Sequence, residues 1–266
     1  MMSHIHFDFP VTEKTYKVKG ERKLKLYVKE PETPKGNRAA ILFFIGGTFK
    51  KNPNSPAHFQ YQAKYFSSQG MVAICVDYRN GEDEGFTPVQ AIVDAKSAVR
   101  WVRRHSDDLG IDPNKIVMCG SSAGGYVCVS SIMLQDLDED DEENDHIPNA
   151  LVIFGAGMDE VDIMRRRYPQ LLDRATELSP IHHIRNCLPP TLWMCGSQEE
   201  DAHKAGGLFE QNKRFIKQMI TKGNEIKLVS YEGMEHGFFR YGRHNNKYFH
   251  MTNTEMKDFL ESLEFI

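Results

Sequence analysis

The chain has 266 residues, of which 40% are hydrophobic and 26% are charged, and its formal net charge is -4. This composition is typical of a globular protein, and the length suits one α/β domain whose core needs no disulfide or metal. The negative charge and the lack of a basic stripe argue against nucleic-acid binding, and no apolar run reaches the ~18 residues of a membrane helix.

The first third of the chain predicts the start of a central sheet. Polar and apolar residues alternate over residues 23–30, which is typical of a half-exposed strand. Continuous apolar runs at 38–45 and 71–78 predict two buried strands of a parallel sheet. The spacing of apolar residues between them predicts a helix over 56–70.

The strongest helix signal covers residues 87–105, where Thr87 is a suitable N-cap and Pro88 suits the first turn. Four further strands are expected at 115–119, 150–154, 191–195 and 226–231, and three further helices at 123–134, 206–222 and 247–263. Strands and helices therefore alternate, which predicts a mostly parallel central sheet with helices on both faces. No repeat or linker divides the chain, so we expect a single domain over residues 1–266.

An acidic segment, QDLDEDDEENDH, covers residues 135–146. We interpret it as a solvated surface loop that follows a helix. A calcium site is the alternative, but the segment lacks the glycine turn and the ligand spacing of an EF-hand.

The five cysteines form no C-x-x-C pair, which argues against a structural zinc site and predicts reduced thiols in the core. Nothing in the sequence calls for a metal or another cofactor. The first residues lack a charged segment followed by an apolar one, so we expect a cytoplasmic protein. A secretory signal trimmed before the first residue is the alternative. The sequence does not specify an oligomeric state.

Ser122 is the candidate nucleophile, because it is the central residue of a G-x-S-x-G match, GSSAG, between an expected strand and an expected helix. This is the context of the nucleophile elbow, a sharp turn that presents the serine hydroxyl at the tip of a strand. Ser121 occupies the first variable position of the motif and is therefore the wrong member. The alternative is a structural serine in a glycine-rich turn.

A serine nucleophile needs a base, and His236 is the best candidate among the 11 histidines. It follows the last expected strand and would reach the carboxyl edge of the sheet, where ligands bind in such folds. An acid is expected between the serine and the histidine in chain order. The loop GSQEED offers Glu199, Glu200 and Asp201, and spacing alone does not choose among them.

An oxyanion hole needs backbone N–H groups aimed at the developing negative charge. Ala123, the residue after the nucleophile, is expected to supply one. Gly46 and Gly47, which follow an early strand, are expected to supply the others. The alternative is that the two glycines form only a turn.

With these residues assembled, the chain resembles the α/β-hydrolase fold. It is most similar to the esterase/lipase branch related to hormone-sensitive lipase and to bacterial carbohydrate acetyl or feruloyl esterases. The resemblance runs from about residue 23 to the C-terminus and rests on FFIGGTF, VDYR, DAKSAVRWVRRHSDDLGIDPNKIVMCGSSAGG, ELSPIHHI, LPPTLWMCGSQE and EGMEHGFF.

The resemblance implies roles for particular residues. The family's G-T-x-D motif carries the acid in its fourth position, which here is Glu199 in place of the usual aspartate, with Asp201 as the second candidate. The family's His-Gly turn matches His236 and the glycine that follows it. The H-G-G-G motif is matched only in part, by IGGT at residues 45–48, so its histidine and one glycine are missing.

The expected activity is that of a serine carboxylesterase without a cofactor. The segment that would form a cap, residues 155–178, is short, which favours a minimal cap and small short-acyl esters, acetylated carbohydrate among them. Two alternatives stay open: a peptidase of the same fold, and a catalytically impaired protein that uses the old site to bind a ligand or to act as a scaffold.

Overall fold

The computed structural model describes residues 5–32, 36–47, 55–80, 87–139, 145–199 and 207–266. One sheet of eight strands runs through the molecule in the order β1-β2-β4-β3-β5-β6-β7-β8. The strands are β1 (Thr12–Lys19), β2 (Arg22–Lys29), β3 (Arg38–Phe44), β4 (Val72–Val76), β5 (Ile111–Ser121), β6 (Ala150–Phe154), β7 (Thr191–Gly196) and β8 (Ile226–Tyr231). The first two are antiparallel to their neighbours, and β4, β3, β5, β6, β7 and β8 are parallel to one another.

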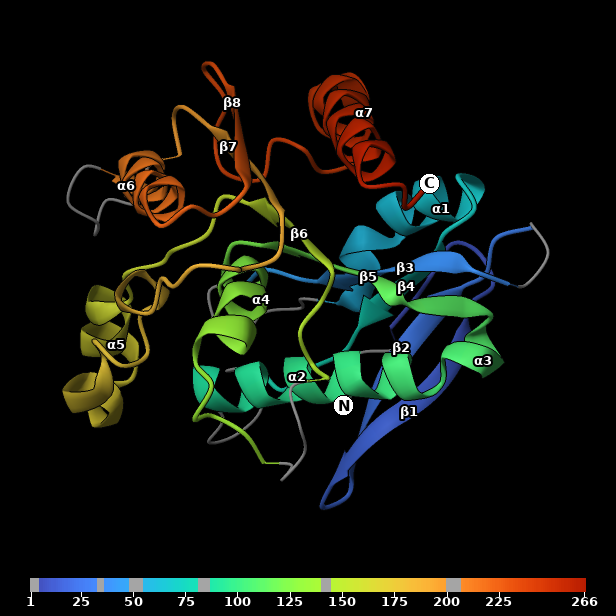
Figure 1. The fold of residues 1–266 in the computed structure, drawn as a ribbon, viewed down its shortest axis with the longest axis horizontal. Helices are drawn as coiled ribbons and strands as arrows, with labels where there is room; N and C mark the ends of the chain where they lie inside the picture. Colours follow the sequence, from blue (N-terminus) through green and yellow to red (C-terminus); the bar gives the residue numbers. More distant parts are fainter. Residues whose placement is uncertain (1–4, 33–35, 48–54, 81–86, 140–144, 200–206) are drawn as a thin grey trace.

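Helices cover both faces of the sheet: α1 and α7 lie on one side, and α2 and α4 on the other (Figure 1). The α-helices are α1 (Gln60–Ser68), α2 (Pro88–Arg104), α3 (Ser106–Leu109), α4 (Ala123–Met133), α5 (Val161–Arg167), α6 (Gly207–Thr221) and α7 (Lys247–Ser262). Short 3-10 helices are η1 (Pro56–Phe59), η2 (Pro169–Arg174), η3 (Pro180–His182) and η4 (His244–Asn246). The expected α/β-hydrolase architecture, with its mostly parallel central sheet, is confirmed.

Most of the expected elements are present within a few residues of their predicted bounds. The helix start at Thr87 is formed as predicted, because its side chain accepts a hydrogen bond from Val89 N and Gln90 completes a capping box. The sequence analysis missed β1, whose burial pattern is mostly exposed and therefore lacks a clear apolar period. It also missed the short elements α3, α5, η2, η3 and η4.

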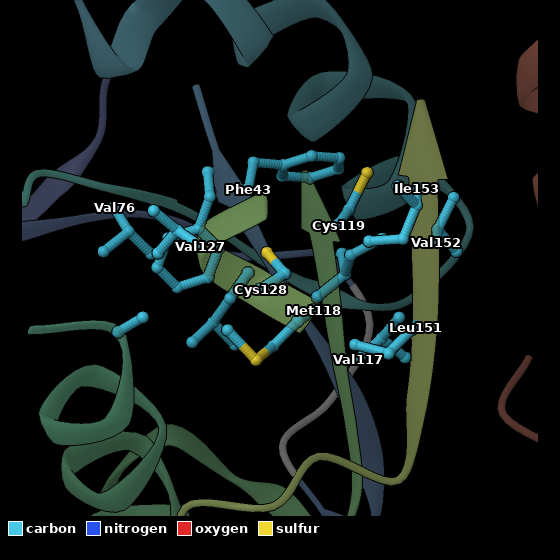
Figure 2. Close-up of a cluster of buried hydrophobic side chains, with 14 of the residues drawn as sticks. Phe43, Val76, Val117, Met118, Cys119, Val127, Cys128, Leu151, Val152 and Ile153 are labelled. Atoms are coloured by element: carbon cyan, nitrogen blue, oxygen red, sulfur yellow. The ribbon is translucent and has the colours of Figure 1, made fainter. Parts of the chain in front are cut away.

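The core lies where α4 packs against the middle strands. Figure 2 shows Val127 and Cys128 of α4 together with Phe43, Val76 and Cys119 from three neighbouring strands, all fully buried. Four of the five cysteines are buried and all five are free thiols, while Cys187 is exposed. Because both faces of these strands are covered, they are continuously apolar, which is why their sequence signal was strong.

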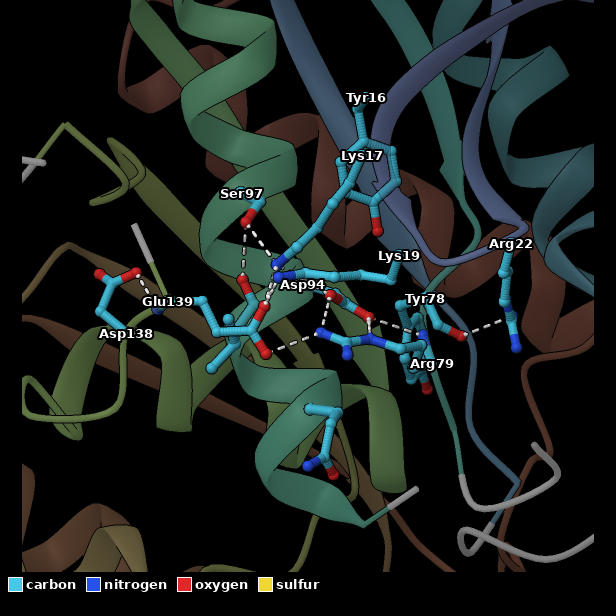
Figure 3. Close-up of polar contacts among 12 residues, drawn as sticks. Tyr16, Lys17, Lys19, Arg22, Tyr78, Arg79, Asp94, Ser97, Asp138 and Glu139 are labelled. Atoms are coloured by element: carbon cyan, nitrogen blue, oxygen red, sulfur yellow. Dashed lines mark hydrogen bonds and ion pairs between the residues drawn. The ribbon is translucent and has the colours of Figure 1, made fainter. Parts of the chain in front are cut away.

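A buried ionic network joins β1, α2 and the turn after β4 (Figure 3). The Arg79 guanidinium donates to both carboxylate oxygens of Asp94, at 2.7 and 2.8 Å, and the Asp94 side chain is fully buried. Lys17 Nζ lies 3.1 Å from the same carboxylate and 3.3 Å from Glu139. Partial burial raises the pKa of Glu139, but Lys19, Lys17 and Arg79 outweigh it and hold that pKa at about 2.

The described ends of the acidic segment are anchored rather than merely solvated. Arg100, whose side chain is buried in α2, donates to both Asp138 and Asp145. His146 is also buried, and its Nδ1 lies 3.1 Å from Arg100 Nη2. The surface-loop interpretation for residues 135–146 therefore needs this addition, while residues 140–144 lie outside the described part of the chain.

No helix in the described part of the chain is both long and apolar enough to cross a membrane. Within the same residues, no group of His, Cys, Asp and Glu side chains is arranged to hold a metal ion.

His146 should make the stability of the protein depend on pH. Burial, and then the charges of Lys96 and Arg100, lower its pKa from 6.5 to about 4. Between these values the unfolded chain binds a proton that the folded chain does not, so the free energy of unfolding should fall as pH decreases from 6.5 to 4. One proton corresponds to a slope of up to ~1.4 kcal/mol per pH unit.

Urea unfolding at several pH values measures this slope. His146→Asn should flatten it, whereas His250→Asn, at an exposed histidine, should leave it unchanged. An equal slope in wild type and His146→Asn would contradict the assignment.

Candidate active site

The carboxyl ends of the parallel strands meet at one edge of the sheet, and the candidate residues follow these ends. Ser122 comes directly after β5, Glu199 after β7 and His236 after β8, while Gly46 follows β3. Parallel strands with right-handed connections bring such loops together although they are far apart in the sequence.

Ser122 occupies a strained turn between β5 and α4. Its backbone has φ 52° and ψ -122°, a conformation that non-glycine residues rarely adopt. Its N–H donates to the carbonyl groups of Phe154 and Gly155, at 3.0 and 3.2 Å, which fixes the turn against the end of β6. This is the predicted strand-turn-helix, and the strain is what turns the serine side chain out of the strand.

The two glycines of the G-x-S-x-G motif are required by close backbone contacts. A Cβ on Gly120 would lie 2.5 Å from Gly124 O, and a Cβ on Gly124 would lie 2.2 Å from Phe44 O and 2.4 Å from Ile45 O. Real Cβ atoms do not approach other heavy atoms this closely. The motif therefore allows α4 to begin directly against the end of β3.

His236 and Glu199 are paired. His236 Nδ1 lies 3.2 Å from Glu199 Oε2. The Glu199 side chain is 2% exposed and that of His236 is 38% exposed. Gly196 N also donates to Glu199 Oε1, at 3.0 Å, so both carboxylate oxygens have a partner. A buried carboxylate held in this way can fix the orientation and tautomer of the imidazole.

Gly155 brings the Glu199–His236 pair next to the turn of Ser122. A Cβ on Gly155 would lie only 1.9 Å from Glu199 Oε2, so the carboxylate rests on the glycine backbone. The carbonyl group of the same glycine accepts the hydrogen bond from Ser122 N. The sequence analysis missed this residue, for which the only signal was a glycine directly after the strand at 150–154.

Aromatic packing holds the histidine loop over the same edge. Phe239 stacks on Phe154, the last residue of β6, with ring centroids 3.9 Å apart. A Cβ on Gly196 would lie 2.0 Å from Met234 O, so the chain just before His236 also packs tightly on the end of β7. His236 is thus held from both sides of its loop.

The candidate oxyanion donors lie beside Ser122. A Cβ on Gly46 would lie 3.0 Å from Ser122 Cβ, so the loop after β3 contacts the serine directly. Gly47 follows with a φ of 149°, which a glycine adopts without strain. Ala123 is the first residue of α4, where backbone N–H groups have no acceptor within the helix.

The structure thus brings together Ser122, Glu199, His236, Gly46 and Ala123. The second candidate acid, Asp201, lies outside the described residues, as do Glu200 and Thr48. The arrangement presents a hydroxyl, an imidazole, a buried carboxylate and backbone N–H groups at one edge, and these are the groups that nucleophilic acyl transfer requires.

Comparisons with known proteins show the family and the fold to which this chain is similar. The BD-FAE family model matches residues 24–204. The structure superposes on that of Thermogutta terrifontis esterase 2 phosphorylated by paraoxon with a TM-score of 0.86, at 35% sequence identity over 96% of this chain and 95% of that chain. The same esterase has also been solved with propionate bound, and that structure has a TM-score of 0.85.

Curated relatives are more distant. A probable carboxylic ester hydrolase of Mycobacterium tuberculosis is 24% identical over 73% of this chain and 49% of its own length. A probable isoprenylcysteine alpha-carbonyl methylesterase of Arabidopsis thaliana is 23% identical over 80% of this chain and 48% of its own length. The chain therefore spans about half the length of these two curated relatives.

The contact between Gly155 and Glu199 should be detectable as energetic coupling. Gly155→Ala forces a methyl group into the carboxylate, and overpacking of this kind costs ~1–3 kcal/mol. We expect the free energy of unfolding to fall by at least this amount, and the double variant Gly155→Ala/Glu199→Ala to recover part of the loss. Urea unfolding of the four proteins in the cycle measures the coupling.

Gly223→Ala is the matched control for backbone strain. Gly223 also has a positive φ, 78°, but open space surrounds its Cβ position. Its replacement should cost only the ~1 kcal/mol of the left-handed conformation. Equal losses of unfolding free energy in Gly155→Ala and Gly223→Ala, with no coupling to Glu199, would contradict the contact between Gly155 and Glu199.

Proposed function

This chain belongs to the BD-FAE family, and from that membership we propose that it is a serine carboxylesterase that acts on small esters with short acyl groups. The observation that carries the proposal is the buried Glu199 carboxylate bound to His236 beside the strained turn of Ser122. Each of these three groups has one role in hydrolysis by way of an acyl-enzyme.

Ser122 is the nucleophile in the proposed mechanism. Its Oγ attacks the ester carbonyl carbon while His236 takes the hydroxyl proton on its Nε2. The tetrahedral intermediate then collapses, the C–O bond to the alcohol breaks, and His236 returns the proton to the leaving oxygen. Water repeats the sequence on the acyl-enzyme and releases the acid and free Ser122.

Glu199 stabilises the imidazolium that forms in each step. Its Oε2 faces His236 Nδ1, which leaves Nε2 as the nitrogen available to the serine. The carboxylate is almost completely buried, so its interaction with the charged ring is screened less than it would be in water. A glutamate can replace the usual aspartate here because Gly155 provides room for its carboxylate.

The oxyanion would be held by backbone N–H groups of Ala123, Gly46 and Gly47. The first belongs to the N-terminus of α4, whose dipole adds positive potential at the reacting carbonyl. These donors are main-chain groups, so the hole does not depend on the histidine that the partial H-G-G-G match lacks. We propose that the remaining IGG sequence is sufficient.

The size of the cap favours small substrates. The segment between β6 and β7 holds only α5, η2 and η3, the longest of which has seven residues. The propionate-bound form of the Thermogutta terrifontis esterase is consistent with a short acyl group. Acetylated carbohydrate is one candidate substrate within this class.

A chain-length series tests the proposed function. We expect kcat/KM for p-nitrophenyl acetate and butyrate to exceed that for p-nitrophenyl octanoate by ~10-fold or more, because an acyl chain too long for its pocket must displace side chains, and overpacking of this kind costs ~1–3 kcal/mol. Initial rates measured spectrophotometrically give the three values. A strong preference for octanoate would contradict the small-ester proposal.

The same assay needs a nucleophile control. Ser122→Ala should lose ~10⁶-fold in kcat and should not react with a serine-directed fluorophosphonate, whereas Ser121→Ala should still react. A folded wild-type protein that neither hydrolyses an ester nor reacts with the probe would instead support the impaired, ligand-binding alternative.

A pair of substitutions tests the acid. Glu199→Gln keeps the size of the side chain but removes the charge that stabilises the imidazolium, so we expect kcat to fall by ~10⁴-fold. Asp201→Asn should have a much smaller effect on kcat. The comparison uses p-nitrophenyl acetate and, for folding, the melting temperature of each variant. A larger loss in Asp201→Asn would reassign the role to Asp201.

A further inference from the structure

Arg240 lies directly against the catalytic loop. A Cβ on Gly237 would lie 3.3 Å from Arg240 Nε and 3.6 Å from Arg240 Cζ, so the arginine side chain folds back over this glycine. Arg240 N also donates to Gly237 O, at 3.3 Å, which closes the turn. Gly237 is the next residue after His236, so the Arg240 side chain packs on the residue that follows the proposed base.

The other basic side chains of this loop already have acidic partners. Arg243 Nη1 lies 3.2 Å from Glu235 Oε1, and His244 Nε2 lies 3.0 Å from the same oxygen. Arg240 makes no ion pair or side-chain hydrogen bond with any residue that the structure describes. Partial desolvation and then the charge of Arg243 lower the pKa of Arg240. No carboxylate among the described residues offsets these two effects.

The segment that carries His58 packs against the segment that carries Arg240. Phe59, which follows His58, stacks on Phe239, which precedes Arg240, with ring centroids 6.1 Å apart. Partial burial and then the positive charge of Arg240 lower the pKa of His58. The Phe59–Phe239 stack thus joins two segments that are remote in the sequence, one carrying His58 and the other carrying Arg240.

A second aromatic contact fixes these segments to one another. The rings of Tyr61 and Tyr241 stack with centroids 3.8 Å apart. In the chain, Arg240 therefore lies between the members of two stacked pairs, Phe59–Phe239 and Tyr61–Tyr241, and these stacks hold its backbone in place. Because the backbone of Arg240 is held in this way, it loses little conformational freedom when a ligand anion binds.

We propose that Arg240 binds a carboxylate group on the alcohol half of the ester substrate. This inference rests on the proposed function. His236 must protonate the leaving oxygen, so the alcohol half leaves past this histidine. Arg240 packs on Gly237, the residue that follows it. A guanidinium matches the planar geometry of a carboxylate through two parallel hydrogen bonds.

The test compares two acetyl esters that differ in charge at one position of the alcohol half: 4-acetoxybenzoate and its neutral methyl ester. The quantity measured is the ratio of kcat/KM for the anionic ester to that for the neutral ester. In Arg240→Gln this ratio should fall ~10-fold, the size typical of a charge-assisted hydrogen bond, and the change should appear mainly in KM. Arg240→Lys should retain part of the ratio because it keeps the charge.

Arg214→Gln is the matched control, because it makes the same change at an exposed arginine on α6. Its ratio should remain within about 2-fold of the wild-type value, as expected for a screened charge away from the site. Added sodium chloride should lower the wild-type ratio toward that of Arg240→Gln. An equal ratio in wild type and Arg240→Gln would overturn the proposal.

A binding measurement separates this inference from the proposed function. Calorimetric titration with 4-hydroxybenzoate, the alcohol product, does not require turnover, and we expect ~10-fold weaker binding to Arg240→Gln than to wild type. Failure to hydrolyse even the neutral ester would contradict the esterase proposal. Equal binding of 4-hydroxybenzoate by both proteins would contradict the carboxylate site.

Discussion

The left-handed turn at Ser122 is the constraint on which the rest of the site depends. A serine with φ 52° and ψ -122° is strained, and it persists only because the surrounding backbone leaves no alternative. Gly120 and Gly124 let the start of α4 pack against β3, and the carbonyl groups of Phe154 and Gly155 hold the Ser122 N–H. Strain in the turn is therefore balanced by contacts with two neighbouring strands.

Close contacts at another glycine, Gly155, organise the other side of the site. Gly155 accepts the hydrogen bond from the serine turn and also supports the Glu199 carboxylate, so one residue sets the relation between these two parts. Glutamate has one more methylene than aspartate, and it reaches His236 because the missing Cβ of Gly155 leaves room for it. The position of the Glu199 carboxylate is thus linked to a glycine 44 positions earlier in the chain.

The cations around α2 and the cation near His236 differ in whether they have acidic partners among the described residues. Around α2, the cations Lys17, Arg79 and Arg100 are matched with carboxylates, which fixes β1 and the acidic segment to the body of the domain. Breaking a buried pair of this kind is costly, since it leaves a charge without a partner. Near His236, by contrast, Arg240 has no acidic partner within the described residues. Such a cation, on the residue that packs next to the proposed base, is suited to binding the anion proposed above.

The sequence by itself determined the fold class and the chemical type of the site, because buried parallel strands are continuously apolar and the G-x-S-x-G motif has a narrow structural context. It also determined the chain order of Ser122, Glu199 and His236. Local patterns carry no record of which loops meet at the sheet edge, so only the tertiary structure decided that Glu199 pairs with His236 and that Gly155 makes room for it. The position of Arg240 over Gly237 likewise depends on a turn and on ring stacking between distant segments. The periodicity of the sequence does not predict either of these contacts.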